Sequence, residues 1–121
     1  MGETVAVIGA SNDETRYSHK AMVLLLENGH EVIPVTPKES SVLGLQVVPT
    51  VQELIPPVDT VTVYVRPAVL LPSVEALIRL APKRIIFNPG TEDTAIMERL
   101  REGGIEVVNA CTIVMQKLGQ F

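Results

Sequence analysis

The fold is decided by the stretch Val5-Ala6-Val7-Ile8-Gly9-Ala10-Ser11-Asn12-Asp13-Glu14-Thr15-Arg16-Tyr17-Ser18. It begins as an apolar, largely β-branched run, stops at a glycine, and passes through small polar residues toward an apolar helix. This order is typical of the first strand, phosphate-binding turn and first helix of a parallel α/β sheet. The stretch therefore predicts a site for the phosphates of a nucleotide.

The rest of the chain continues the alternation of strand-like and helix-like segments. The expected strands are Thr4 to Ile8, His30 to Val35, Thr60 to Val65, Arg84 to Phe87 and Ile105 to Val108. The expected helices begin near Ser18, Thr50, Leu70, Thr91 and Ala110, and the polar segment Glu39 to Gln46 is expected to be a loop. Strict alternation predicts right-handed crossovers, so we expect one α/β domain over residues 1–121 with a five-stranded parallel sheet covered by helices on both faces.

Local signals set the ends of two of these helices. Ser18 is expected to cap the first helix and Gly29 to stop it. Thr50 and Glu53 have the spacing of a capping box, in which each side chain satisfies a free backbone amide of the other residue. Pro56-Pro57 should end that second, short helix.

Composition excludes several function classes. The chain has 121 residues, 46% of them hydrophobic, a net charge of −4 and four aromatic residues. It lacks the long basic runs and stacking aromatics of nucleic-acid binding proteins, and its apolar runs are too short for a membrane span. Cys111 is the only cysteine, and no signal peptide is evident, so we expect a reducing, cytoplasmic location.

The candidate phosphate loop comprises Gly9, Ala10, Ser11, Asn12, Asp13 and Glu14. Gly9 allows a tight turn at the strand end, and the amides from Ala10 to Glu14 could face a pyrophosphate. Ser11 and Glu14 stand where the dinucleotide fingerprint has its second and third glycines, so the motif is incomplete. The alternative is a turn that only joins strand to helix.

Four further segments end expected strands or begin expected helices, where parallel sheets bind ligands. Arg16 and Tyr17 could contact phosphate, or could be a solvated arginine and a residue that staples the helix start. Lys38 follows the second strand, where an NAD site usually has a carboxylate. A cation there suits a phosphorylated ribose, as in NADP or coenzyme A, although it could simply start a loop.

The third and fourth strands are followed by Val65-Arg66-Pro67 and Asn88-Pro89-Gly90, which could contact the ligand or serve only as turns and caps. His19 and His30 have no carboxylate or cysteine at ligand spacing, so neither is expected to be catalytic or metal-binding. Cys111 is interpreted as a small buried residue. We therefore expect no catalytic residue and no metal site.

In their order and spacing, several of these segments together resemble the small stand-alone CoA-binding domain proteins, which are similar to the N-terminal domain of the succinyl-CoA synthetase alpha subunit. The resemblance covers Thr4 to Phe121 and is carried by Val7 to Ser11, Val32 to Val35 with Pro37-Lys38, Val61 to Val65, Asn88 to Glu92, and Asn109 to Thr112.

The resemblance implies a Rossmann-like domain that places the ADP part of CoA over Gly9 to Glu14 and the 3′-phosphate near Lys38. Further contacts would come from Val65 to Pro67 and Asn88 to Gly90. The phosphorylated histidine of the synthetase lies in a following domain, so ligase chemistry is not implied. We expect a module that binds CoA or an acyl-CoA without catalysis of its own. A small NADP-dependent oxidoreductase, or an adaptor subunit of a separate acyl-CoA synthetase, is the alternative. A homo-oligomer or protein partner is compatible with all three.

Overall fold

The structure is a computed structural model that describes residues 2–121. Its strands are β1 (Thr4–Ile8), β2 (Glu31–Val35), β3 (Ser41–Val42), β4 (Leu45–Gln46), β5 (Thr60–Val63), β6 (Arg84–Phe87) and β7 (Glu106–Asn109). Its α-helices are α1 (Tyr17–Glu27), α2 (Pro67–Leu70), α3 (Val74–Leu80), α4 (Thr94–Glu102) and α5 (Thr112–Lys117). Two 3₁₀ segments, η1 (Val51–Glu53) and η2 (Leu71–Ser73), complete the chain.

The main sheet has five strands in the order β2-β1-β5-β6-β7, and every neighbouring pair is parallel. The α/β architecture and the five-stranded parallel sheet predicted from the sequence are therefore confirmed. The chain first steps from β1 to β2 on one side, then returns to add β5 on the other side of β1. The boundary between β1 and β5 is thus the switch point at which sheets of this kind bind ligands.

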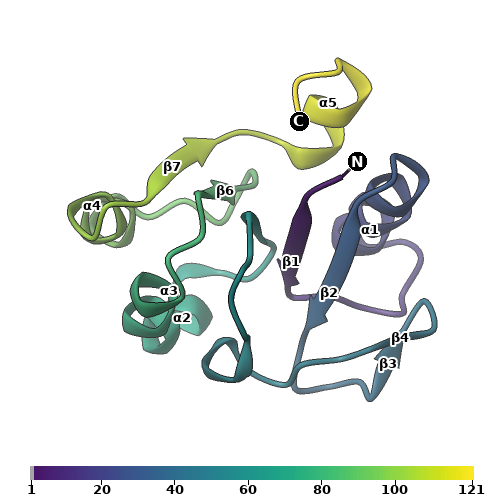
Figure 1. Ribbon diagram of the computed structural model, residues 1–121, viewed down its shortest axis with the longest axis horizontal. Helices are drawn as coiled ribbons and strands as arrows, with labels where there is room; N and C mark the ends of the chain where they lie inside the picture. The colour runs from purple at the N-terminus through teal and green to yellow at the C-terminus, as the bar shows by residue number, and fades with distance from the viewer. Residues whose placement is uncertain (1) are drawn as a thin grey trace.

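Helices cover both faces of the sheet, which gives three layers (Figure 1). Helices α1 and α5 lie on one face, and α2, α3 and α4 lie on the other. Strand β1 is continuously apolar because both of its faces are buried. Ala6 and Ile8 belong to one core cluster, while Val5 and Val7 belong to the cluster on the opposite face of the sheet. Both sets are buried, as expected for a central parallel strand.

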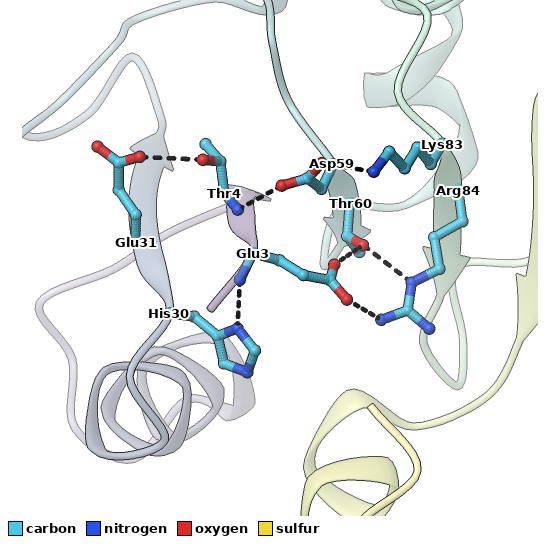
Figure 2. A network of polar contacts seen from close by, with 8 residues as sticks. All are labelled: Glu3, Thr4, His30, Glu31, Asp59, Thr60, Lys83 and Arg84. Atoms are coloured by element: carbon cyan, nitrogen blue, oxygen red, sulfur yellow. Dashed lines mark hydrogen bonds and ion pairs between the residues drawn. The ribbon is translucent and has the colours of Figure 1, made fainter. Parts of the chain in front are cut away.

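At the amino-terminal edge of the sheet, polar side chains connect the starts of β2, β1, β5 and β6 and the residues just before them (Figure 2). The Glu3 carboxylate accepts hydrogen bonds from the Thr60 hydroxyl and the Arg84 guanidinium, and Arg84 also donates to Thr60. The Asp59 carboxylate accepts the amide of Thr4 at 2.9 Å. The Thr4 hydroxyl also donates to the Glu31 carboxylate at the start of β2, so the network connects β2, β1, β5 and β6 at the edge opposite the switch point.

Several predicted element ends are wrong, each for a local reason. The first helix begins at Tyr17 without a side-chain cap, and Ser18 is buried within its first turn. Thr94 rather than Thr91 begins α4, because the Asp93 carboxylate accepts the Ile96 amide. At the short η1 segment, the hydroxyl of Thr50 bonds the carboxylate of Glu53 directly, so the expected reciprocal bonds to backbone amides do not form.

The helical segment after β5 begins earlier than predicted. It starts at Pro67, not near Leu70, and β5 ends at Val63, not at Val65. Pro72 lies in η2, a 3₁₀ turn between α2 and α3, so the break in the helix accommodates its missing amide. The last helix likewise begins at Thr112 instead of Ala110.

The predicted loop between Glu39 and Gln46 contains a small hairpin. Strands β3 and β4 pair antiparallel across a two-residue turn made by Leu43 and Gly44. Both turn residues have positive φ, at 52° and 74°, as a type I′ turn requires. Leu43 stands at the position that usually carries Asn or Asp in such a turn. The sequence therefore lacks the Asn-Gly or Asp-Gly pair that would have predicted the hairpin.

Candidate functional site

The register of the sheet brings the predicted strand ends side by side. Ile8 is paired with Val35 on one side and with Val63 on the other, and Val63 is paired with Phe87. The residues that follow these positions therefore line one edge of the sheet. They include Gly9, Thr36, Tyr64 and Asn88, and Gly9 lies at the switch point.

Gly9 is required at this point for two separate reasons. Its φ of +91° is a conformation that residues with a side chain rarely adopt. A Cβ atom here would also lie 2.9 Å from Cγ1 of Val65 and 3.1 Å from the carbonyl of Tyr64. The absence of a side chain lets the loops after β1 and β5 touch. This contact forms the floor of the candidate site.

The loop after Gly9 leaves some of its amides open. The amides of Gly9 and Ala10 point to the carbonyl of Val35, at 3.0 and 3.4 Å, and the amide of Asp13 donates to the Ser11 hydroxyl. Within residues 2–121, the amides of Ser11, Asn12 and Glu14 donate to no protein atom. Three open donors within four residues suit an anionic ligand.

Asp13 shapes the second half of this loop. Its carboxylate accepts the hydroxyl of Thr15 at 2.6 Å and the amide of the same residue at 3.0 Å. These bonds hold the pKa of Asp13 below its usual value, so the side chain is ionised at neutral pH. Arg16 lies 3.9 Å from this carboxylate and is otherwise exposed. The guanidinium is therefore free to turn toward a ligand.

A buried histidine anchors the loop to α1. Nδ1 of His19 lies 2.8 Å from the carbonyl oxygen of Ser11. A carbonyl can only accept, so Nδ1 carries the proton in this contact. The sequence pattern predicts neither a catalytic role for His19 nor this positioning role. The bond joins residues eight positions apart, one in the loop and one at the start of the expected helix, and no local signal indicates it.

The start of α1 faces the same loop without a protein cap. No side chain bonds the first amides of this helix, so its positive end remains open near the loop. Tyr17 is 70% exposed, and its ring lies 5.5 Å from the ammonium of Lys20. Both predicted residues of the helix start, Arg16 and Tyr17, are thus on the surface beside the loop.

Lys38 lies just beyond the end of β2. Its amide donates to the buried hydroxyl of Thr36 at 3.2 Å, which fixes the backbone, while the side chain is exposed. Among residues 2–121 no carboxylate pairs with Lys38. The hairpin that follows contacts the candidate phosphate loop, because the side-chain amide of Asn12 donates to the carbonyl of Ser41 at 2.8 Å.

Asn88 is buried and its side chain is fully bonded within the protein. Its Nδ2 donates to the Thr62 hydroxyl at 2.7 Å and to the Val63 carbonyl at 2.8 Å. Its Oδ1 accepts the amide of Thr112 at 2.9 Å. The side chain therefore joins the ends of β5 and β6 to the start of α5. At this strand end Pro89 and Gly90 are exposed, but Pro89 has no amide hydrogen and the amide of Gly90 donates to the Glu92 carboxylate at 2.6 Å, so only their backbone carbonyls are left for a ligand.

The segment after β5 presents backbone and apolar surface. Val65 is half-buried against the core and against Gly9. Arg66 is exposed at the start of α2, and Pro67 is the first residue of that helix. Figure 1 shows α2 on the face of the sheet opposite α1, so these residues extend the candidate site across the switch point.

Beside this edge, the ring of Tyr64 packs into the cluster under α1 and α5. Its hydroxyl is buried and makes no hydrogen bond to residues 2–121, although the hydroxyls of Thr62 and Thr112, which bond one another, lie nearby. Burial raises the pKa of Tyr64 to about 12 despite these nearby hydroxyls. Cys111 is half-buried and unpaired. In the same described part of the chain, no cluster of three metal-ligating side chains occurs.

The sheet order and its switch point define a Rossmann-like α/β domain. The sequence model of one family, the CoA binding domain, matches residues 3–117. The chain belongs to this family. No helix of residues 2–121 has the length and apolar character needed to span a membrane.

Two relatives match most of this chain. The crystal structure of an uncharacterized protein is 40% identical, with a TM-score of 0.94 over 100% of this chain and 99% of its own. The uncharacterized protein YneT of Bacillus subtilis strain 168 is 28% identical over 104 residues, which are 86% of this chain and 77% of YneT.

The same fold occurs inside a much larger enzyme. A dinucleotide-forming acetyl-coenzyme A synthetase of Ca. Korarchaeum cryptofilum superposes with a TM-score of 0.77 at 20% identity. The match covers 89% of this chain but only 26% of the synthetase chain. This likeness relates the fold to a domain of that synthetase.

Proposed function

We propose that the protein is a stand-alone module that binds coenzyme A or an acyl-CoA and performs no catalysis of its own. The observation that carries the proposal is the pairing of an open phosphate loop at the switch point with an unpaired lysine at the end of the neighbouring strand. Membership of the CoA binding domain family supports the choice of ligand.

The loop supplies the part of the site that would hold the pyrophosphate. The amides of Ser11, Asn12 and Glu14 are open, and the uncapped start of α1 adds a positive electrostatic potential beside them. Arg16 is within reach of the same place. These groups recognise phosphate charge and make no contact that would favour one base or acyl group.

Lys38 supplies the part that distinguishes CoA from a dinucleotide such as NAD. Strand β2 pairs with β1, so the end of β2 lies next to the phosphate loop. A ribose that sits over this strand end would bring its phosphate to the ammonium of Lys38, whereas an unphosphorylated ribose would prefer a carboxylate there. NADP meets the same electrostatic demand and is therefore a required comparison.

Isothermal titration calorimetry with CoA, 3′-dephospho-CoA and NADPH tests this proposal. We expect CoA to bind wild-type protein most tightly and the Lys38→Ala variant about tenfold more weakly, because a charge-assisted hydrogen bond contributes on the order of 1.5–3 kcal/mol, reduced here by exposure. Dephospho-CoA should bind both proteins equally. Lys117→Ala removes an exposed lysine from α5 and serves as the control.

The outcomes separate the alternatives. Equal affinities for CoA and dephospho-CoA in wild-type protein would remove Lys38 from the site. Tight binding of NADPH without CoA binding would favour the oxidoreductase. Absence of binding by all three compounds would overturn the proposal and leave the adaptor subunit.

A further inference from the structure

An apolar groove of about 510 Å³ runs between the helices on the face of the sheet away from α1. Pro67, Ala68 and Leu71 form one wall, and Ala95 and Ile96 of α4 form the other. Leu71 is 61% exposed, and its side chain adds apolar surface to the first wall of the groove. The volume lies within the range of roughly 300–1,000 Å³ found for small-molecule sites.

The groove opens at the same edge of the sheet as the candidate CoA site. One wall comes from α2, η2 and the start of α3, which follow β5, and the other comes from the first two turns of α4, which follows β6. Pro67 belongs to the groove and to the strand-end segment Val65–Pro67 of the candidate site. The two sites are therefore continuous through Pro67.

The strand order sets the direction in which a bound CoA would run. Lys38 follows β2, Gly9 follows β1, Pro67 follows β5, and Gly90 follows β6. A 3′-phosphate at Lys38 and a pyrophosphate beside Gly9 place the nucleotide over β2 and β1. The pantetheine arm, which joins the pyrophosphate to the thioester, must then extend toward β5 and β6 and enter the groove there, with the acyl chain beyond it.

We propose that this groove holds the acyl chain of a CoA thioester, so that the preferred ligand is an acyl-CoA rather than free CoA. The inference rests on the proposed function, since it takes the orientation of CoA from Lys38 and Gly9. In this proposal the bound acyl chain would cover the exposed side chain of Leu71.

The charges around the groove restrict the chemistry of the acyl chain. Arg99 is the cation of the groove, and its Nη2 lies 2.9 and 3.0 Å from the two carboxylate oxygens of Glu75. Asp93 adds a carboxylate near the mouth, where it accepts the amide of Ile96. With its arginine already paired and two carboxylates present, the groove suits an uncharged acyl chain and disfavours a dicarboxylic one.

Calorimetric titrations with CoA, acetyl-, butyryl-, hexanoyl- and succinyl-CoA test the inference. Wild-type protein should bind the uncharged series about twofold to fourfold more tightly for each methylene that enters the groove, and succinyl-CoA should lose this gain. Ala95→Phe and Ala68→Phe each fill the groove from an exposed position on a different wall, so one variant remains informative if the other misfolds. Val69→Phe, next to the groove but outside its lining, is the matched control.

Both filled variants should reduce the ratio of the CoA and butyryl-CoA dissociation constants to about one, whereas Val69→Phe should retain the wild-type ratio. Equal binding of CoA and butyryl-CoA by wild-type protein would overturn the inference and leave the proposed function intact. A chain-length preference that survives both filled variants would place the acyl chain elsewhere. Conversion of a dimer to a monomer by these variants, seen by sedimentation, would assign the groove to a second copy of the chain instead. If neither CoA nor any acyl-CoA binds, the proposed function fails, and this inference fails with it.

Discussion

Gly9 and Val65 touch across the switch point of the sheet: a Cβ atom on Gly9 would approach Cγ1 of Val65 to 2.9 Å. Gly9 follows β1 and Val65 follows β5. These two neighbouring strands flank the switch point, because β2 is added on one side of β1 and β5 on the other. Their contact sets the spacing between the phosphate loop and the start of α2. The stability of the fold and the shape of the candidate site therefore depend on the same glycine.

Gly9→Ala should lower the free energy of unfolding by about 2–4 kcal/mol, because strained backbone and a steric overlap add together. Gly29→Ala separates the two effects, since Gly29 has a φ of +85° but no atom within 4 Å of an added Cβ. We expect it to cost only about 1–2 kcal/mol. Urea denaturation of both variants measures the difference. Equal losses would show that the contact with Val65 contributes nothing.

Asn88→Ala should destabilise the protein by about 2–4 kcal/mol, since it leaves the buried amide of Thr112 and the carbonyl of Val63 without a partner. Thermal and urea unfolding measure this effect. Asn28→Ala is the control, because the Asn28 side chain bonds Gln116 at an exposed position. Its loss should stay below about 1 kcal/mol. A mild effect of Asn88→Ala would mean that the network around it is not structurally important.

The elements that can be predicted from the sequence are those whose residues carry strong local signals. The limits of β1 and β6 are predicted correctly, because Val5 to Ile8 and Ile85 to Phe87 are apolar runs that both sheet faces bury. The β3–β4 hairpin was missed because its strands have two residues each and its turn puts Leu43 at positive φ. The pairing depends on tertiary contacts, since Val42 is buried in the core cluster under α1.

In the candidate site, too, the features with a local sequence signal can be predicted and those that depend on tertiary contacts cannot. The position of Gly9 at a strand end follows from the sequence pattern, and the structure adds the reason why a side chain cannot stand there. The internal bonds of Asn88 could not be predicted, since they join residues 24 to 26 positions apart. The bond from His19 to Ser11 joins α1 to the loop before it, and no local sequence signal predicts which backbone oxygen a histidine contacts.

The pH dependence of stability at the alkaline end should depend on Tyr64. Burial raises its pKa to about 12, from 10 in the unfolded chain. The folded state thus keeps a proton that the unfolded state has lost, so stability is fully present below pH 10 and falls as the pH rises toward 12. Tyr64→Phe should remove this contribution to the alkaline loss. Because the hydroxyl has no partner, the variant should be at least as stable at pH 7.

Urea unfolding at pH 7, 9, 10, 11 and 12 checks this prediction, with Tyr17→Phe as the control on the exposed tyrosine. A marked destabilisation of Tyr64→Phe at pH 7 would reveal a bond to the hydroxyl. Identical alkaline profiles for wild-type protein and Tyr64→Phe would contradict the raised pKa.

Acid stability should depend on Asp59 at the opposite edge of the sheet. The amide of Thr4 is the main cause of a pKa below the ordinary value of 3.8, and Lys83 at 3.3 Å lowers it further (Figure 2). A lowered pKa in the folded state means that the contribution is present above pH 3.8 and is lost as the pH falls through the folded value. Asp59→Asn should therefore flatten the decrease in stability between pH 4 and pH 2.

Thermal unfolding across that range measures the effect, and Glu98→Gln on the exposed face of α4 is the control. An unchanged acid profile in Asp59→Asn would show that the bond to Thr4 does not favour the ionised carboxyl.

A crystal structure of the protein grown with CoA gives a direct test of CoA binding at the carboxyl edge of the sheet. We predict electron density for the pyrophosphate at the amides of Ser11, Asn12 and Glu14, with the 3′-phosphate at the ammonium of Lys38. Density for CoA at any other place, or none at a saturating concentration, would show that this edge is not a CoA site.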